Sequence, residues 1–470
     1  MLKTRQVSQM THILNTDARN AVEKIATYAA HLKFEDLSEL TVQRARQVVL
    51  DFLGITLGGY QTRLGRLAAD YVAAVRSGSE ASILADGRRS SMDGAAWANA
   101  VMSCLLGMSD SHRLCGHVAS EVVPVALALG ECRRLDGRQV ITAIAAGYDV
   151  FGAIQPAVKA FQRERGHDHK GQVGTLASAV VAGKAMGLDA AKLGRALALS
   201  VDLACGTEQY TFDAGLCDTE ALIAGYGASN GIVAARMADF GFRGPPGALD
   251  GPYGYFHAFG SGYDPAYLDQ LGQTFMLAGT GFKPHSGCRH VHPCVDATHE
   301  LLRRGQPPLD QIVSIEVGTY KNAVTPDFRV NYQPQDADAA GYSLPVTVSV
   351  VLARGSWYRE DIEAYNQPDI RRLWPLVNVY LDEEIEAAYP QKNGCVVKVT
   401  TQGGRLYEGR VEYAKGEPEN MLDDAELEYK FRRLVGDFLP SKRVGRMLEL
   451  VSFLETLDDI GDLVRSTNRP

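Results

Sequence analysis

Ionisable side chains are concentrated in the segment FKPHSGCRHVHPC, residues 282–294, which runs into an apolar, helix-like stretch. Its composition fits three kinds of site: a metal centre, a binding pocket for anions, or a solvated loop. Cysteine and histidine are common zinc ligands, and an extended strand would present four of them on one face. These four are Cys288, His290, His292 and Cys294. Pro293 instead fits the first turn of a helix, and neither histidine pair has the spacing of a zinc cluster, so we expect no metal here.

An anion pocket explains the same segment better. Lys283 supplies a positive charge, Arg289 supplies bidentate donors, and a helix that begins near His292 would add free N–H groups. The alternative is a solvated loop, because isolated charged side chains usually lie at the surface. We predict that this segment forms one edge of a pocket for a small anion and that it needs no metal and no cofactor.

A second polar group occurs in GMSDSHRLCGHVASEVVPVALALG, residues 107–130, where a loop leads into an apolar helical stretch. The loop carries four polar side chains of interest: Asp110, Ser111, His112 and His117. The alternative to a chemical role is ordinary helix capping, either by Ser120 or by the Asp-Ser pair.

A third polar group, GHDHK at residues 166–170, lies ahead of a helix that Gly174 opens. It contains His167 and His169, and a charged exposed loop is the alternative interpretation. Histidine has an ordinary pKa near neutrality, which suits proton transfer. Together the three groups predict metal-free acid–base chemistry on a small anion.

Composition and missing motifs exclude several classes of protein. The formal net charge of -8 leaves no broad basic surface for nucleic acid. No stretch approaches the roughly 18 uncharged apolar residues of a membrane span. The eight cysteines are scattered and form no CxxC pair, which favours reduced thiols and a cytoplasmic location. There is no Walker P-loop, no strand-flanked GxGxxG, no HExxH and no GxSxG, so nucleotide-binding and metalloprotease functions are not expected.

From about residue 20 to 240 the chain is rich in Ala, Gly and Leu at helical spacing, as in GTLASAVVAGKAMGLDAAKLGRALALSVDLA. Small residues three and four positions apart let helices approach closely, which is typical of helices buried on several sides. Within this segment Gly187 is expected to close one helix and Asp189 to cap the next. The sequence therefore predicts a large all-helical bundle.

The pattern changes at residues 241–265, where Gly, Pro and aromatic residues break the helical period. Strand-like runs follow at 312–320 and 395–413, and Gly403 and Gly404 divide the second run as a hairpin would. The end of the chain returns to amphipathic helix. We predict a mainly α protein with an α+β second domain, divided as follows: an all-helical domain over 1–275, completed by C-terminal helices 425–470, and a smaller α+β lid over 276–424.

Five collinear segments resemble the MmgE/PrpD family, which includes 2-methylcitrate dehydratase, cis-aconitate decarboxylase and iminodisuccinate epimerase. They are RARQVVLDFLGITLGG, SDSH with the following GH and EVVPVALALGE, GTLASAVVAGKAMGL, GFKPHSGCRHVHPCVDA, and AAGYSLPVTVSVVLARG. The resemblance covers nearly the whole chain. It implies a helical domain with an α+β lid, a homodimer, and an active site in the cleft between the two domains.

Position by position, the resemblance implies a set of site residues. The catalytic candidates are His117, His169, Lys283 and Asp110. The substrate-binding candidates are Ser111, His112, His167, Glu220, Cys288 and Arg289. The second catalytic histidine falls on His169 or, because the spacing to Gly174 is one residue short, on His167.

One departure from the family pattern concerns the substrate. Where many members have a lysine and a histidine, this chain has Glu220 and Ile223. An acidic group in the cleft would repel a third substrate carboxylate. The first functional hypothesis is a hydro-lyase acting on a hydroxy polycarboxylate such as 2-methylcitrate, in propionate metabolism. An epimerase or decarboxylase acting on a related di- or tricarboxylate, and a non-catalytic binding protein of the same fold, are the alternatives.

Overall fold

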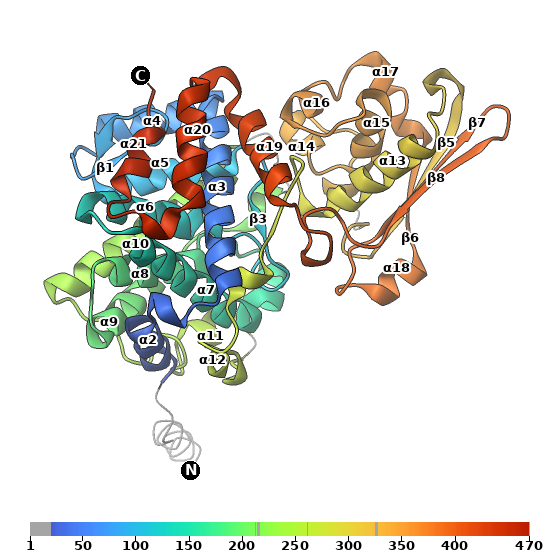
Figure 1. Cartoon of the computed structure of the whole chain (residues 1–470). Coiled ribbons are helices and arrows are strands. Elements are labelled where there is room, and N and C mark those ends of the chain that lie inside the picture. The colour runs from blue at the N-terminus through green and yellow to red at the C-terminus, as the bar shows by residue number, and fades with distance from the viewer. Residues whose placement is uncertain (1–19, 212, 214–216, 261, 325–327, 470) are drawn as a thin grey trace, which may run out of the picture.

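The computed structural model describes residues 20–469 apart from 212, 214–216, 261 and 325–327, so the first part of the predicted helical domain, residues 1–19, lies outside the described residues. A helical domain and a smaller domain with a sheet lie side by side (Figure 1). This is the predicted mainly α architecture with an α+β second domain.

The helical domain is built from helices whose small residues allow close packing. Gly231 of α10 lies so near α8 that a Cβ atom added there would come within 2.3 Å of Cβ of Ser178. Its main helices are α2 (Ala21–His31), α3 (Glu39–Tyr60), α4 (Arg63–Val75), α5 (Met92–Cys104), α6 (Ala119–Arg133), α7 (Gly137–Arg165), α8 (Val173–Ala185), α9 (Ala190–Val201) and α10 (Thr219–Phe240). The short helices α11 (Tyr255–Phe259) and α12 (Ala266–Asp269) follow.

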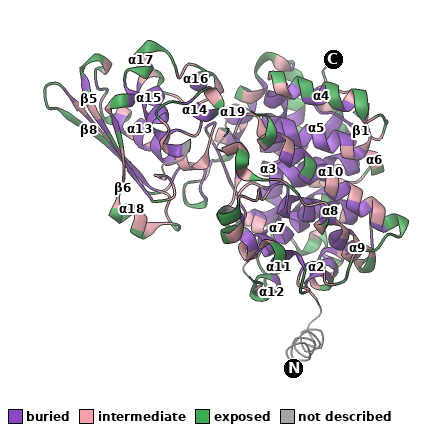
Figure 2. Ribbon diagram, turned by 180° about the vertical axis from the view of Figure 1, so that it is seen from behind, coloured by how far each residue is buried: buried purple, intermediate pink, exposed green. Residues whose placement is uncertain are grey.

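One helix of this domain is long and apolar enough to span a membrane by length and composition, the part of α7 from Gly137 to Gln162. Most of its apolar window is buried inside the domain (Figure 2). Tyr148, Phe151 and Ile154 of this helix are fully buried. A buried core helix passes the same test as a membrane helix, and the packing identifies α7 as a core helix.

The second domain has a four-stranded sheet in the order β6-β5-β7-β8. Its strands are β5 (Ile312–Thr319), β6 (Val377–Leu381), β7 (Cys395–Thr401) and β8 (Leu406–Val411). Strand β5 runs parallel to β6 and antiparallel to β7, and β7 and β8 form the predicted hairpin, with Gly404 at φ +74 in the turn. The helices are α13 (His292–Arg304), α14 (Ala337–Ala340), α15 (Leu344–Arg354), α16 (Arg359–Glu363), α17 (Pro368–Arg371) and α18 (Glu383–Ala388).

The chain then returns to the helical domain through α19 (Asp424–Val435), α20 (Ser441–Ser452) and α21 (Gly461–Ser466) (Figure 1). Apolar residues of these helices join the core of the first domain. On α19, Lys430 donates to the Asp51 carboxylate of α3 and, over 2.8 Å, to the carbonyl of Met108. Because all these groups are buried, the ion pair fixes α19 against α3 at the base of the loop that carries Asp110.

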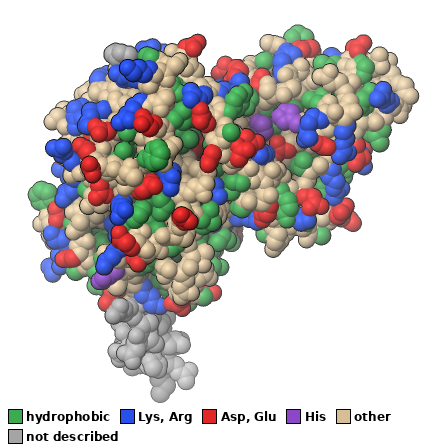
Figure 3. Space-filling model, in the orientation of Figure 1, with side chains coloured by type: hydrophobic (Ala, Val, Ile, Leu, Met, Phe, Trp, Pro, Cys, Tyr) green, Lys and Arg blue, Asp and Glu red, His purple; other side chains and the backbone are tan. Residues whose placement is uncertain are grey.

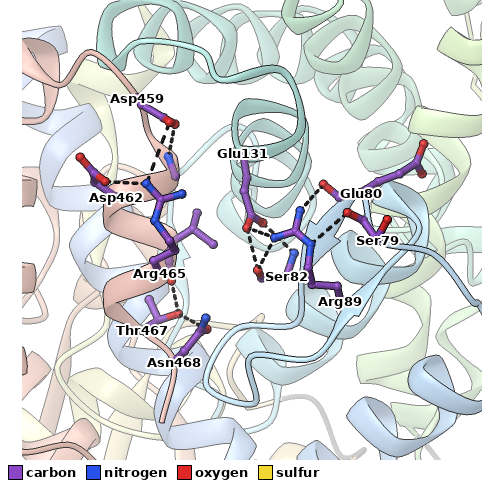
Figure 4. A network of polar contacts seen from close by, with 12 residues as sticks. Ser79, Glu80, Ser82, Arg89, Glu131, Asp459, Asp462, Arg465, Thr467 and Asn468 are labelled. Atoms are coloured by element: carbon purple, nitrogen blue, oxygen red, sulfur yellow. Dashed lines mark hydrogen bonds and ion pairs between the residues drawn. The ribbon is translucent and has the colours of Figure 1, made fainter. Parts of the chain in front are cut away.

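A polar network lies on the helical domain where the last residues of the chain come close to α6 and to the loop before α5 (Figure 4). The buried carboxylate of Glu131 accepts bonds from the Ser82 backbone N–H and hydroxyl, each over 2.7 Å, and from Arg89. Ser82 and Arg89 belong to a short antiparallel pair, β1 (Ala81–Ser82) with β2 (Arg89–Ser90). The network therefore holds this pair onto α6.

The two domains are also joined by a two-residue ladder, in which β3 (Asp110–Ser111) pairs antiparallel with β4 (Gly281–Phe282). Asp110 lies opposite Phe282, and Ser111 lies opposite Gly281. This pairing brings the loop that contains His117 next to the segment that contains Lys283.

Candidate active site

A cavity of about 680 Å³ opens where the helical domain meets the second domain. Its helical wall includes His117, His169, Lys170 and Glu220, and the opposite wall includes Lys283, Cys288, Arg289 and Tyr342. Among the described residues, six Lys or Arg side chains and four Asp or Glu side chains line it. The lining thus has an excess of positive charge although the whole chain is acidic, as a site for a small carboxylate requires.

Lys283 follows directly after β4 and is 3% exposed. Its Nζ donates to the carbonyl of Gly287 over 3.2 Å. Burial lowers the pKa of Lys283 to about 8, because the charged ammonium loses hydration. At neutral pH the side chain is therefore a positive charge in a partly dehydrated wall, and it can release a proton more readily than an exposed lysine.

His117 is held by the backbone of the loop that precedes α6. Its Nδ1 bonds to the carbonyl oxygen of Asp110 over 2.5 Å. A carbonyl only accepts, so Nδ1 carries the proton in the neutral ring and the lone pair is on Nε2. Burial, together with the positive charge of Lys283, holds the pKa of His117 well below its usual range. The ring is therefore a neutral base beside a lysine.

His169 lies across from His117, with 6.2 Å between the ring centroids. Its Nε2 is buried and has no hydrogen-bond partner among the described residues. Burial lowers the pKa of His169 to about 4. A Cβ atom on Gly116 would come within 3.1 Å of this Nε2, and Gly116 has φ +83, so a glycine is required beside the ring.

The structure separates the two histidines that the sequence left as alternatives. The ring of His167 packs edge-on against Phe259, with 5.3 Å between centroids, and lies outside the described lining of the cavity. His169 lies in the lining. The backbone turns between the two residues, so the side chains of His167 and His169 point in different directions.

Three candidates from the first loop are placed outside the described lining: Asp110, Ser111 and His112. The buried carboxylate of Asp110 accepts the backbone N–H groups of Val118 and Ala119 and, over 2.8 Å, the hydroxyl of Tyr148. It therefore caps the start of α6, and only its backbone carbonyl contacts His117. Asp110 is a positioning residue in this geometry.

The other two residues of the loop also have structural contacts. Ser111 belongs to the ladder with β4. Nδ1 of His112 accepts the backbone N–H groups of Leu114 and Cys115, and a backbone pair with Gly116 closes the loop. These contacts shape the turn that presents His117.

Cys288 and Arg289 both line the cavity, but Arg289 is already paired. Its Nε donates to Glu417 over 2.9 Å, and Nη1 donates to the carbonyl of Lys415 over 3.1 Å. The predicted bidentate donor for substrate is thus engaged within its own domain. The backbone N–H of Cys288 donates to Gly341, and a Cβ atom on Gly287 would come within 2.4 Å of the same carbonyl oxygen.

Glu220 lines the cavity as expected, but it is part of an ion pair that the sequence did not reveal. Its Oε1 accepts from Nζ of Lys170 over 2.9 Å, and its Oε2 accepts from the hydroxyl of Tyr342 over 2.7 Å. Burial alone would lower the pKa of Lys170, but the carboxylates of Glu220 and Asp168 raise it well above its usual range. The carboxylate of Glu220 is therefore neutralised, and the expected repulsion is weaker than an unpaired group would give.

Lys170 and Tyr342 are two of the lining residues that sequence reasoning did not assign. Lys170 is adjacent to His169 in the GHDHK segment, so its position in the sequence could have suggested that it lines the site. Tyr342 lies in the AAGYSLPV segment of the second domain, and nothing local distinguishes it from a core tyrosine. Only the contact across the domain junction assigns it to the site.

Three side chains, Asp168, His169 and Glu208, bring possible metal-ligand atoms within 4.8 Å of one another, and two of them, His169 and Glu208, line the cavity. They belong to the segment before α8 and to a short 3-10 helix (Glu208–Thr211). Asp168 also accepts from the hydroxyl of Tyr210 over 2.6 Å. The expectation of a metal-free site rests on sequence spacing, and this cluster is the place where a metal assay has to test it.

Comparisons with known proteins agree with the geometry. The family model of the MmgE/PrpD N-terminal domain matches residues 23–268, and that of the MmgE/PrpD C-terminal domain matches residues 285–456. Cis-aconitate decarboxylase of Homo sapiens is 26% identical, over 96% of this chain and 95% of the relative. The enzymes of that name from Aspergillus terreus and Mus musculus are 23% and 25% identical, covering 97% and 96% of this chain and 98% and 94% of the relatives. Since the two family models together span most of its length, the chain belongs to the MmgE/PrpD family.

Proposed function

We propose that this enzyme is a lyase that removes carbon dioxide from a small unsaturated polycarboxylate of the cis-aconitate type. The observation that carries the proposal is the cavity in which buried Lys283 faces two neutral histidines, His117 and His169, within a positively charged lining. The relatives that bear the name cis-aconitate decarboxylase favour this reaction over the other reactions of the family.

The reaction passes through a carbanion beside a carboxylate. The C–C bond to the departing carbon dioxide breaks, the electron pair stays on carbon, and the adjacent carboxylate delocalises the charge. Lys283 supplies the fixed positive charge that stabilises this state, an effect of about 3 kcal/mol for one well-placed donor. Bound carboxylates also raise the pKa of His117 and His169 from their depressed values, because opposite charges favour the protonated ring. One ring then delivers the proton that completes the product.

A hydro-lyase acting on 2-methylcitrate is the second candidate, and one observation favours it. The Nδ1–H bond to Asp110 leaves the lone pair of His117 on Nε2, which suits removal of a proton from carbon. His169 or Lys283 would then protonate the departing hydroxyl. An epimerase would use the same groups to return the proton to the opposite face.

One assay separates these reactions. The purified enzyme is incubated with cis-aconitate, 2-methylcitrate and citrate, while carbon dioxide and ultraviolet absorbance of the conjugated double bond are followed separately. Carbon dioxide from cis-aconitate is the expected result. A rise in absorbance with 2-methylcitrate and no carbon dioxide would replace the decarboxylase by the hydro-lyase. Deuterium exchange into unchanged substrate would replace both by the epimerase.

The pH dependence of kcat/KM is expected to reflect the pKa values of the free enzyme. His169, with a pKa of about 4, can act as a base only above that pH, so the hydro-lyase should gain activity through that region, whereas the decarboxylase, whose histidine delivers a proton, should show no such rise. Lys283, with a pKa of about 8, loses its charge as the pH rises further, so activity falls there. Lys283→Arg should move the alkaline limb upward, because arginine stays protonated. A profile that is flat between pH 7 and 10 would remove Lys283 from the mechanism.

Glu220→Gln is expected to tighten the binding of tricarboxylates roughly tenfold, which corresponds to about 1.4 kcal/mol. The substitution keeps the shape of the side chain but removes the carboxylate that pairs with Lys170, so the net charge of the cavity lining becomes one unit more positive. Titration of both proteins with citrate, cis-aconitate and succinate measures the effect. Asp239→Asn is the matched control, because it breaks an exposed pair with Lys192 on the surface. Equal affinities of Glu220→Gln and the unchanged protein would place substrate elsewhere in the cavity.

We further propose a homodimer in the cytoplasm that binds neither nucleic acid nor membranes. The support for a dimer is an apolar surface on the helical domain, where Phe240 and Phe242 are exposed beside Val233 and Met237. The net charge of -8 supports the absence of a nucleic-acid partner.

A further inference from the structure

The second domain contains another cluster of ionisable side chains, formed by His285, Asp296 and His299. Asp296 and His299 lie three residues apart on α13, so they share one face of the helix, and His285 comes from the loop that follows β4. Their possible ligand atoms all lie within 4.8 Å of one another. In the described part of the chain, none of the three lines the cavity of the candidate active site. Figure 3 shows histidine side chains on this domain beside the domain junction.

Both histidines of the cluster have a buried ring nitrogen without a hydrogen-bond partner among the described residues. His285 is 9% exposed, and its Nδ1 is buried without a hydrogen-bond partner among the described residues. The same holds for Nε2 of His299. Fully buried His292, whose ring centroid lies 5.6 Å from that of His285, offers a further unpartnered Nε2. Buried polar atoms without partners are costly, so a ligand that satisfied these nitrogens would stabilise the domain.

One distance in the cluster is close to that between two ligands of a single metal ion. Nε2 of His285 and Oδ1 of Asp296 are 3.4 Å apart, which is long for a hydrogen bond. Two ligands bound at about 2.0 to 2.1 Å to one tetrahedral zinc ion are separated by roughly 3.3 to 3.5 Å. The observed separation would let both atoms bind one ion with little movement.

Contacts outside the cluster orient the ligands. Oδ2 of Asp296 accepts the backbone N–H of Lys415 over 2.7 Å, which leaves Oδ1 for the ion. The ring of His299 bonds to the backbone at Gly355, and its Nε2 is the nitrogen that stays without a partner among the described residues. Outer bonds of this kind are typical of histidine and carboxylate ligands in metal sites.

We propose that His285, Asp296 and His299 bind one divalent transition-metal ion, with zinc as the ion whose preferred ligands they match. Water or His292 completes the coordination. The ion is structural, because it connects the loop two residues after Lys283 to α13 and does not contact the cavity. By fixing this loop, the ion restricts the position of Lys283, and it takes no part in the proton transfers.

The test uses the purified full chain, stripped with a chelator and then titrated with zinc or cobalt chloride. We expect one equivalent to bind, with a rise in melting temperature and, for cobalt, the visible absorption bands of a four-coordinate ion. Asp296→Asn and His299→Ala should each weaken binding roughly tenfold or more, while circular dichroism reports an unchanged helix content.

His169→Ala is the matched control, because it removes a ligand from the other cluster with suitable atoms, at the cavity. This substitution should leave the amount of bound metal unchanged, at one ion per chain. Loss of binding in His169→Ala with retention in His299→Ala would place the ion in the cavity and overturn the proposal. Absence of binding at micromolar zinc, or unchanged affinity in both Asp296→Asn and His299→Ala, would also overturn it.

Discussion

Lys283→Met is expected to lower kcat/KM by about 100- to 1,000-fold, the usual cost of removing one preorganised donor from a developing negative charge. Methionine keeps the length and burial of the side chain but cannot carry charge. Because the substitution removes a buried ammonium that makes one hydrogen bond among the described residues, the fold should remain stable. Turnover on the true substrate and thermal unfolding of the same preparation measure the two effects separately.

Lys192→Met is the control for this experiment, since Lys192 lies in an exposed pair with Asp239. It should change neither turnover nor the melting temperature appreciably, as is usual for surface pairs. If Lys283→Met retained near-normal turnover, the positive charge would not act in the transition state. If it failed to fold, Lys283 would be a structural residue instead.

His117→Ala is expected to lower kcat by about 100- to 10,000-fold, the range contributed by one positioned acid–base group. The bond from Nδ1 to Asp110 fixes both the tautomer and the orientation of the ring, so no neighbouring side chain can replace Nε2 at the same point. Stability should change little, because the main caps of α6 come from the Asp110 carboxylate. Single-turnover kinetics on the wild type and the variant would show whether the proton-transfer step is affected.

His167→Ala provides the comparison for the histidine assignment. Its ring packs on Phe259 outside the described lining, so the variant should lose packing and keep kcat within a few-fold, whereas His169→Ala should lose turnover. The reverse result would show that the cavity rearranges around His167 when substrate binds. A His117→Ala variant with normal kcat would leave His169 as the acid–base group.

The structure changes the role that the sequence predicted for Glu220, the residue that departs from the family pattern. By the resemblance to the family pattern it is an acidic residue in place of an expected basic one, and its charge alone predicts rejection of tricarboxylates. In the structure it bonds both Lys170 of the helical domain and Tyr342 of the second domain. It therefore acts as a contact across the cavity mouth as well as a charge. Substrate selection at this position depends on whether the bound ligand competes for Lys170.

Local patterns in the sequence determined the elements of the fold. Asp189 caps α9 by accepting the N–H of Lys192, and Gly187, with φ +71, closes the preceding helix, as predicted. Gly404 turns the β7–β8 hairpin. These features depend on a few adjacent residues, whose backbone preferences and short-range bonds are the same in any context. The helical domain and the α+β domain could be predicted for this reason.

The chemistry of the site depended on residues far apart in the chain. Asp110 meets Phe282 in the β3–β4 ladder, and this pairing alone brings His117 to Lys283. The sequence named both residues but could not show that Asp110 caps a helix, that Arg289 is engaged by Glu417, or that Glu220 is paired with Lys170. Nor could it give the pKa shifts of His169 and Lys283, because these arise from loss of hydration when two domains close around the groups. Sequence fixes which groups are present, and tertiary packing decides their partners and their charge, since burial and pairing are properties of surrounding atoms and not of neighbours along the chain.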